Sequence, residues 1–145
     1  MTPESPTVHA SAVLTGARAV LIRGPAGAGK SKLALALLGA AQTGLLRFAR
    51  LIGDDRVHLE PVHQRLLVRP APALAGLIEV RGLGIRRFDH EPVAVVGRIV
   101  DLAAEDAERL PVSDETVLLG IPLPRLAVAP GVDPLPALLI ALGRH

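Results

Sequence analysis

The sequence contains a glycine-rich segment whose fixed positions match a phosphate-binding loop. The segment runs through Gly24, Pro25, Ala26, Gly27, Ala28, Gly29, Lys30 and Ser31. An apolar run over residues 17–23 predicts a short buried strand before it, and the leucines and alanines of residues 30–41 predict a helix after it. A loop between a strand and a helix can point its N–H groups into one hollow at the positive end of the helix dipole. The arrangement therefore predicts a P-loop domain rather than a chance glycine-rich turn.

Two side chains of this loop have distinct expected roles. The ammonium group of Lys30 supplies a positive charge for the β- and γ-phosphates of a nucleotide, and the hydroxyl of Ser31 can ligate Mg²⁺. The whole segment from Gly24 to Ser31 is the predicted nucleotide-binding set. The motif does not identify the reaction, because ATPases, GTPases, small-molecule kinases and some protein kinases all use it.

The composition limits the fold and the partners. A chain of 145 residues suits one domain, and we expect a single P-loop domain over residues 1–145. Half of the residues are hydrophobic but only Phe48 and Phe88 are aromatic, so the core is expected to be the aliphatic core of an α/β layer fold. The scarcity of aromatic rings and a net charge of only +2 argue against nucleic acid as a partner.

Targeting signals are not evident. Residues 1–7 lack a basic segment followed by an apolar run, and no stretch of about 18 apolar residues occurs anywhere in the chain. The sequence has no cysteine, which rules out disulfides and thiolate metal sites. We therefore expect a cytoplasmic protein without a membrane partner.

Further elements are predicted from hydrophobic patterning and turn residues. Strands are expected over residues 50–53, 77–80 and 93–102, with a hairpin over 56–60 and 65–69 that turns near Gln64. The charged stretch 101–108 is predicted to be a solvated helix face. The C-terminal part is expected to be irregular because prolines interrupt it, before a short apolar helix over residues 135–143.

Two adjacent acids, Asp54 and Asp55, follow the predicted strand 50–53. Neighbouring residues of an extended chain point to opposite sides, so the two carboxylates are not expected to do the same job. One of them can face Mg²⁺ or the attacking hydroxyl while the other holds the loop, and the alternative is an ordinary surface turn. Their position after a strand downstream of a P-loop favours a functional role, because acids in that setting hold the metal in other P-loop proteins.

A second informative stretch covers residues 78–85. Glu79 and Arg81 are two residues apart, so on a strand they would share one face. A carboxylate for a metal and a guanidinium for a phosphate would then lie side by side, while Gly82 and Gly84 permit close approach of the backbone. The alternative is an exposed ion pair on a strand.

Taken together, these motifs resemble HPr kinase/phosphorylase, the bifunctional bacterial enzyme that phosphorylates a serine of the phosphocarrier protein HPr. The resemblance rests on four features in the family's order. They are His9, which lies 21 residues before Lys30, the loop Gly24–Ser31, the pair Asp54-Asp55 followed by Arg56-Val57, and the octet Ile78-Glu79-Val80-Arg81-Gly82-Leu83-Gly84-Ile85. It extends over about residues 8–130 and is specific, because the octet is rare among P-loop proteins.

The resemblance implies a fold and a set of roles. The expected fold is α/β, a P-loop domain with a mixed β-sheet flanked by helices, similar to phosphoenolpyruvate carboxykinase. By similarity, Lys30 binds phosphate, Ser31 and Glu79 ligate Mg²⁺, and one acid of the pair 54–55 takes the proton of the substrate serine. His9 and Arg81 are expected to support this site. ATP and Mg²⁺ are the implied cofactors, HPr of the phosphotransferase system is the implied partner, and a homo-oligomer, a hexamer in the family, is the implied assembly.

The sequence departs from the family in two places. Members of the family usually have an N-terminal domain, and because the P-loop begins at residue 24 we expect that domain to be absent, as in the short forms of alphaproteobacteria. The Pro-Gly-Arg-Asn of the family is replaced by Pro130-Gly131-Val132-Asp133, so the arginine expected there is missing, and Arg125 is the nearest candidate to replace it. The kinase direction is therefore better supported than reverse phosphorolysis.

Two other functions remain open at the level of sequence. The chain can be a module that binds nucleotide and reports it to a partner without turnover. ATP binding without labelling of HPr would indicate such a module. It can also be a kinase for a small metabolite, although such kinases usually carry an arginine-rich lid that is not obvious here. Offering small hydroxylated acceptors alongside HPr would distinguish these possibilities.

Overall fold

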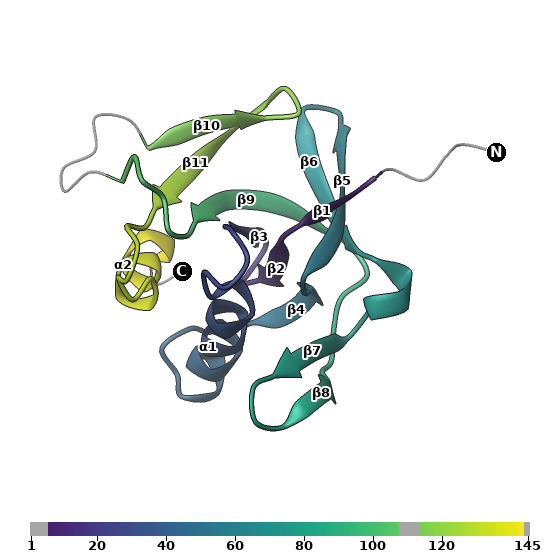
Figure 1. The fold of residues 1–145 in the computed structure, drawn as a ribbon. Coiled ribbons are helices and arrows are strands. Elements are labelled where there is room, and N and C mark those ends of the chain that lie inside the picture. The colour runs from purple at the N-terminus through teal and green to yellow at the C-terminus, as the bar shows by residue number, and fades with distance from the viewer. Residues whose placement is uncertain (1–5, 108–113, 144–145) are drawn as a thin grey trace.

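The computed structural model describes residues 6–107 and 114–143 of the chain. The elements in this part, shown in Figure 1, are β1 (Thr7–His9), β2 (Ser11–Leu14), β3 (Ala19–Arg23), α1 (Lys30–Gln42), β4 (Arg50–Gly53), β5 (Arg56–Val62), β6 (Arg65–Pro70), the 3-10 helix η1 (Pro72–Leu74), β7 (Leu77–Val80), β8 (Gly84–Arg87), β9 (Ala94–Asp101), β10 (Glu115–Leu118), β11 (Ile121–Ala127) and α2 (Leu135–Leu142). Neither α-helix of the described part has the length and apolar character that a bilayer crossing requires.

The main sheet is mixed and has β3 and β9 at its centre. β3 runs parallel to β9 and antiparallel to β2, and β2 in turn pairs antiparallel with β4. The last residues of β9 also pair in parallel with β11, whereas its first residues pair antiparallel with β6, which leads to β5 and β1. This arrangement confirms the predicted α/β class with a mixed sheet.

The central strands bury both of their faces. Ala19 and Leu21 of β3 belong to one apolar cluster, together with residues of β5, β6 and β11, whereas Val20 and Ile22 belong to a second cluster with residues of both helices. Successive side chains of a strand alternate between faces, so β3 needs apolar residues throughout. In Figure 1 the helices α1 and α2 lie below β9, and β6 and β10 lie above it.

Most of the predicted elements are confirmed. The strand before the loop begins at Ala19, the helix after it ends at Gln42, and the strands predicted over residues 50–53 and 77–80 have these same bounds. The predicted hairpin is formed by β5 and β6. His63 and Gln64 make its turn with φ of 49° and 65°, the left-handed conformation that tight hairpins require.

Two predictions were wrong. The region predicted to be irregular contains the strands β10 and β11, although β11 includes Pro122 and Pro124. Prolines at alternate positions are tolerated because their missing N–H groups lie on the same side, and only the later residues Arg125 to Ala127 pair with β9. The charged stretch 101–108 is not a helix face either, because Asp101 is the last residue of β9; Glu108 lies outside the described residues.

Candidate active site

The phosphate loop joins β3 to α1, as the sequence predicts. Gly27 and Gly29 have φ of 81° and 99°, which side-chain-bearing residues rarely adopt. Gly24 packs so closely that a Cβ atom there would lie 3.1 Å from Cβ of Leu102. No side chain caps the first turn of α1, so its N–H groups remain available to an anion.

The side chain of Lys30 lies back over this loop. Its Nζ donates hydrogen bonds to the carbonyl oxygen of Gly24 at 2.8 Å and to that of Pro25 at 3.2 Å. The ammonium group is therefore held beside the backbone of the loop, where a bound phosphate would meet it.

Asp54 connects the loop to the acid pair. The hydroxyl of Ser31 donates to Asp54, with its Oγ 2.9 Å from Oδ1 and 2.8 Å from Oδ2, and Asp54 is only 5% exposed. The chain reaches this position through Gly53, where a Cβ would lie 2.8 Å from Cγ1 of Val57, so only glycine fits. The side chain that the sequence assigns to Mg²⁺ thus contacts one of the two acids directly.

Asp55 points elsewhere. Its Oδ1 lies 4.0 Å from Nδ1 of His9, and both side chains are about two-thirds exposed. The residue has a φ of 68°, which turns the chain sharply between β4 and β5. The two carboxylates have different contacts, and the positive φ at Asp55, not the alternation of a continuing strand, accompanies this difference.

A cavity of about 270 Å³ brings several of these groups together. It is lined by Ser31, Asp54, Asp55, Leu74, Leu77, Glu79 and Ile85. Glu79 enters it from β7, the first strand of the β7–β8 hairpin that lies beside α1 in Figure 1. The cavity therefore gathers hydroxyl and carboxylate oxygens, the donors that Mg²⁺ prefers, from three separate parts of the chain.

Arg81 lies outside the strand that carries Glu79. The strand β7 ends at Val80, and Arg81 lies exposed in the turn that leads to β8, so the argument from strand alternation fails there. The two glycines of this stretch, Gly82 and Gly84, have φ of 88° and 82° and serve the hairpin turn. The structure places neither Arg81, His9 nor Lys30 among the residues that line the cavity.

An ion-pair cluster, formed by Arg23, Asp101, Arg125 and Asp106, lies next to the loop and was not anticipated. Nε of Arg23 lies 2.7 Å from Oδ1 of Asp101, and Nε of Arg125 lies 2.6 Å from Oδ2 of the same carboxylate. Arg125 also donates two hydrogen bonds to Asp106, at 2.9 and 3.0 Å. The cluster ties together the ends of β3, β9 and β11, and its members are too far apart in the sequence to suggest contact.

The charges in this cluster support one another. Burial alone would raise the pKa of Asp101, but the hydrogen bonds and charges of Arg23 and Arg125 outweigh it and hold the pKa below its usual value. The hydrogen bond from Arg125 likewise lowers the pKa of Asp106, and Asp106 and Asp101 together raise the pKa of Arg125. Each of the three guanidinium nitrogens of Arg125 thus donates a hydrogen bond to a carboxylate of the protein.

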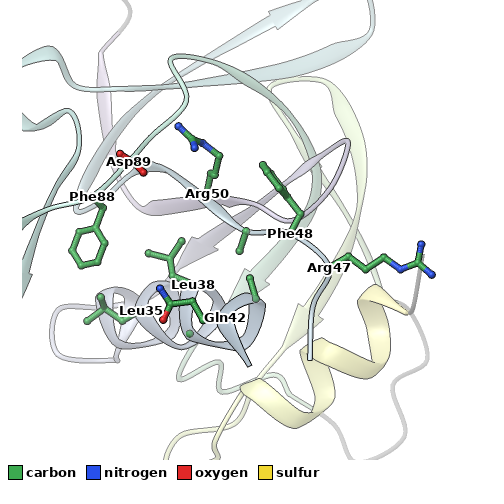
Figure 2. Close-up of a pocket in the computed structure, with 11 residues that line it drawn as sticks. Leu35, Leu38, Gln42, Arg47, Phe48, Arg50, Phe88 and Asp89 are labelled. Carbon is green, nitrogen blue, oxygen red and sulfur yellow. The ribbon is translucent and has the colours of Figure 1, made fainter. Parts of the chain in front are cut away.

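A larger cavity of about 480 Å³ lies at the other end of α1 (Figure 2). Leu35, Leu38 and Gln42 of α1 form one side, and both phenylalanines of the chain, Phe48 and Phe88, contribute to its wall. It contains none of the predicted site residues. The smaller cavity is therefore the candidate active site on chemical grounds, despite its size.

Comparison with known proteins gives a consistent result. Residues 2–90 match the family described as HPr Serine kinase C-terminal domain. The chain is 31% identical to the HPr kinase/phosphorylase of Caldicellulosiruptor bescii and 32% identical to that of Peptoclostridium acidaminophilum, over 84% and 86% of its own length. These matches cover 41% and 42% of the relatives, so the chain spans about two-fifths of their length.

A solved structure agrees over nearly the whole chain. The Hpr(Ser) kinase/phosphatase from Coxiella burnetii superposes with a TM-score of 0.75 at 26% identity, covering 95% of this chain and 93% of the solved one. The sequence match includes the phosphate loop, the acid pair and the octet 78–85, and the structural match extends the similarity to the C-terminal strands. The chain belongs to the HPr Serine kinase C-terminal domain family.

Proposed function

We propose that the chain binds ATP with Mg²⁺ and transfers the terminal phosphoryl group to a serine hydroxyl of HPr or an HPr-like phosphocarrier of the phosphotransferase system. The observation that carries this proposal is the hydrogen bond between Ser31 of the phosphate loop and Asp54 of the acid pair, inside a cavity that Glu79 also lines. The family membership and the names of the relatives support the choice of reaction and acceptor.

The nucleotide is held by the loop Gly24–Ser31. The uncapped N–H groups of α1 and the ammonium group of Lys30 supply positive charge where the β- and γ-phosphates lie. Because three glycines leave the loop without bulky side chains, the backbone can follow the phosphates closely.

Ser31 and Glu79 would hold the Mg²⁺, and the oxygen donors that line the cavity fit this hard cation. In residues 6–107 and 114–143 no three His, Asp or Glu side chains are close enough to hold a metal alone, so phosphate oxygens and water would complete the shell. When bound, Mg²⁺ neutralises charge on the transferring phosphoryl group. Asp54 keeps the Ser31 hydroxyl directed into the site.

Asp55 is proposed to accept the proton of the attacking hydroxyl, since it lines the cavity with an exposed carboxylate whereas Asp54 is buried. In the proposed step the serine oxygen forms its bond to the γ-phosphorus, the bond to the ADP oxygen breaks, and the proton passes to the carboxylate. His9, whose Nδ1 lies 4.0 Å from Oδ1 of Asp55, is proposed to support this part of the site. Arg81 is proposed to reach the phosphates from the hairpin turn, because it is exposed and has no role in the strand pairing.

The ion-pair cluster bears on the direction of the reaction. Arg125 is occupied by Asp101 and Asp106, so it is not free to replace the arginine that is missing after Gly131. This observation favours the kinase direction over phosphorolysis. It also supports a second candidate function, a module that binds nucleotide without turnover.

The proposal includes a setting for the reaction. An ATP-consuming modification of a phosphotransferase protein belongs in the cytoplasm.

A homo-oligomer, with a hexamer as the family form, is proposed because α2 is apolar yet leaves Ile140 82% exposed.

Incubation with γ-labelled ATP, Mg²⁺ and the HPr encoded in the same genome tests the proposal. We expect acid-stable phosphoserine on HPr, and no label when the target serine is replaced by alanine. ATP binding without any labelled product would favour the nucleotide-binding module. Labelling of small hydroxylated acceptors in place of HPr would indicate a metabolite kinase.

A further inference from the structure

Ser11, in β2, is a buried polar residue beside the acid pair. Within the described ranges the buried polar or charged residues are Ser11, which is 0% exposed, and Asp54. The hydroxyl of Ser11 donates to Oδ1 of Asp54 at 2.6 Å. A short hydrogen bond to a carboxylate in a buried setting fixes the orientation of both groups.

The same hydroxyl also contacts the second acid. Its Oγ accepts a hydrogen bond from the backbone N–H of Asp55 at 3.3 Å. That residue has a left-handed backbone, and two further hydrogen bonds hold the turn: Ala10 N–H to the Asp55 carbonyl at 3.2 Å and Arg56 N–H to the Asp54 carbonyl at 2.8 Å. Ser11 thus holds the side chain of one acid and the backbone of the other.

The contact has a consequence for the phosphate loop. Oδ1 of Asp54 receives hydrogen bonds from Ser11 and from Ser31, so Ser11 occupies part of the acceptor capacity of the carboxylate that orients Ser31. Without Ser11 the carboxylate would keep only its contacts with Ser31, so its orientation, and with it the direction of the Ser31 hydroxyl, would be less firmly held. Groups behind a ligand that orient it are commonly worth roughly 10–100-fold in metal affinity or activity.

We propose that Ser11 is a positioning residue that sets the geometry of both acids and, through Asp54, of the Ser31 hydroxyl. This inference rests on the proposed binding of Mg²⁺ and ATP, but its main test requires no phosphoryl transfer. Nothing in the sequence points to this role, because a single serine among Ala10, Ala12 and Val13 resembles an ordinary small strand residue.

The test compares Ser11→Ala with the matched control Thr15→Ala. The variant loses a hydroxyl from the turn of the same β2–β3 hairpin, where Oγ1 of Thr15 donates a long, exposed hydrogen bond to the carbonyl of Arg18 at 3.5 Å. ATP binding is measured by calorimetry with EDTA and over a series of Mg²⁺ concentrations. For Ser11→Ala we expect the affinity for ATP in EDTA to be unchanged. The Mg²⁺ concentration that produces half of the metal-dependent gain in ATP affinity should rise about tenfold. The control is expected to match the wild type.

A second measurement checks the contact itself. The amide proton of Asp55 should exchange faster with solvent in Ser11→Ala than in the wild type, and at the wild-type rate in Thr15→Ala. Each protein is measured at the same number of degrees below its own melting temperature. If Ser11→Ala does not fold, Ser11→Cys keeps the size of the side chain but donates only weakly, and the same direction of change is expected.

The outcomes separate this inference from the proposed function. An unchanged Mg²⁺ requirement in the folded Ser11 variant overturns the positioning role, even if the amide exchanges faster. If the wild type never labels HPr but the Mg²⁺ requirement shifts as expected, the kinase proposal fails and the role of Ser11 stands. Where labelling occurs, kcat of Ser11→Ala should fall by about tenfold or more, with KM for HPr nearly unchanged.

Discussion

Lys30 carries the only full positive charge within the phosphate loop, and its ammonium group lies against the loop carbonyls. Replacing it with alanine should leave the fold intact, because the side chain contributes little to either apolar cluster. We expect Lys30→Ala to lower kcat/KM for HPr labelling by about 10²-fold or more, since a preorganised charge at the transferring group is lost. Calorimetry with ATP measures the accompanying loss of affinity.

Lys32 provides the control for this experiment. It lies two residues further along α1 and is exposed, so Lys32→Ala removes the same charge from the protein without touching the loop. Equal losses in the two variants would mean that general attraction of the nucleotide, and not a local contact, explains the effect.

The two acids are expected to respond differently to substitution. Asp54→Asn places an amide N–H₂ group or a weaker acceptor against the hydroxyls of Ser11 and Ser31, so both ATP·Mg²⁺ affinity and kcat should fall, each by at least about tenfold. Asp55→Asn should leave ATP·Mg²⁺ binding unchanged and lower kcat by about 10²–10⁴-fold, as expected for loss of a general base. Calorimetry and initial-rate assays separate the two patterns, and the reverse pattern would exchange the roles.

At this scale the sequence predicts the motif residues better than their surroundings. The loop and the acid pair are recognisable because the spacing of a few residue types fixes their local conformation. Ser11 escapes prediction because its importance comes from residues 43 and 44 positions away. The strand argument for Arg81 does not apply, because nothing local shows that β7 ends at Val80.

Among the secondary-structure elements, the ends of β3, β9 and β11 are held by the ion-pair cluster around Asp101. The backbone reinforces it, since Leu102 N–H donates to the Arg23 carbonyl at 2.8 Å and Val128 N–H donates to the Asp101 carbonyl at 2.9 Å. Because Arg23 directly precedes the loop, the cluster forms the support on which the loop begins. Loss of this cluster should therefore lower the free energy of unfolding more directly than it changes the rate of phosphoryl transfer.

Asp101→Asn is predicted to destabilise the fold by about 1–3 kcal/mol at pH 7, because two partly buried guanidinium groups lose their shared carboxylate. The pKa of Asp101 in the folded state lies below its usual value of 3.8, so the carboxylate stabilises the fold above that pH. This contribution is lost as the pH falls through the lower, folded-state pKa. The difference between wild type and variant should thus be constant near neutrality and shrink below about pH 4.

Urea denaturation over a pH series measures this difference. Glu60→Gln serves as the control, because it breaks an ion pair with Arg69 in which both side chains are nearly half exposed. Such pairs contribute about 0–1 kcal/mol, so the control should change little. A difference for Asp101→Asn that persists unchanged at pH 2.5 would contradict the charge-based explanation.

The elements that the sequence predicts are those with strong local patterning. α1 consists of leucine and alanine, and the β5–β6 turn contains residues suited to positive φ. The strands β10 and β11 were missed because Pro122 and Pro124 are evidence against a strand in an isolated segment. The two prolines are tolerated because the alternate residues, Ile121 and Leu123, are buried in the core. Only the tertiary fold determines that these residues are buried.

For the whole molecule, the two apolar clusters on opposite faces of the central strands explain how a chain with two aromatic residues builds a stable domain. Alternation along β3 and β9 lets small aliphatic side chains fill both sides. α2 closes one cluster through Leu138, which is fully buried. The outer side of this helix is apolar as well, and this is unusual for a surface that faces water.

The exposed side of α2 therefore offers a test of assembly. Ile140 is 82% exposed, and a homo-oligomer that covers it would remove this apolar surface from water. Ile140→Glu should shift the protein from its assembled form towards the monomer, because a carboxylate buried in an apolar interface is strongly unfavourable. Light scattering coupled to size exclusion, over a hundredfold range of concentration, measures the mass.

Leu138→Ala distinguishes assembly from folding. Because Leu138 packs inside the domain, its truncation should lower the free energy of unfolding by about 2–5 kcal/mol without directly altering the interface. Ile140→Glu should leave the unfolding of the isolated domain nearly unchanged while it reduces the mass. If the wild type is monomeric at every concentration, the hexamer expected from the family does not apply to this chain, and Ile140 must then be covered by another partner or remain in water.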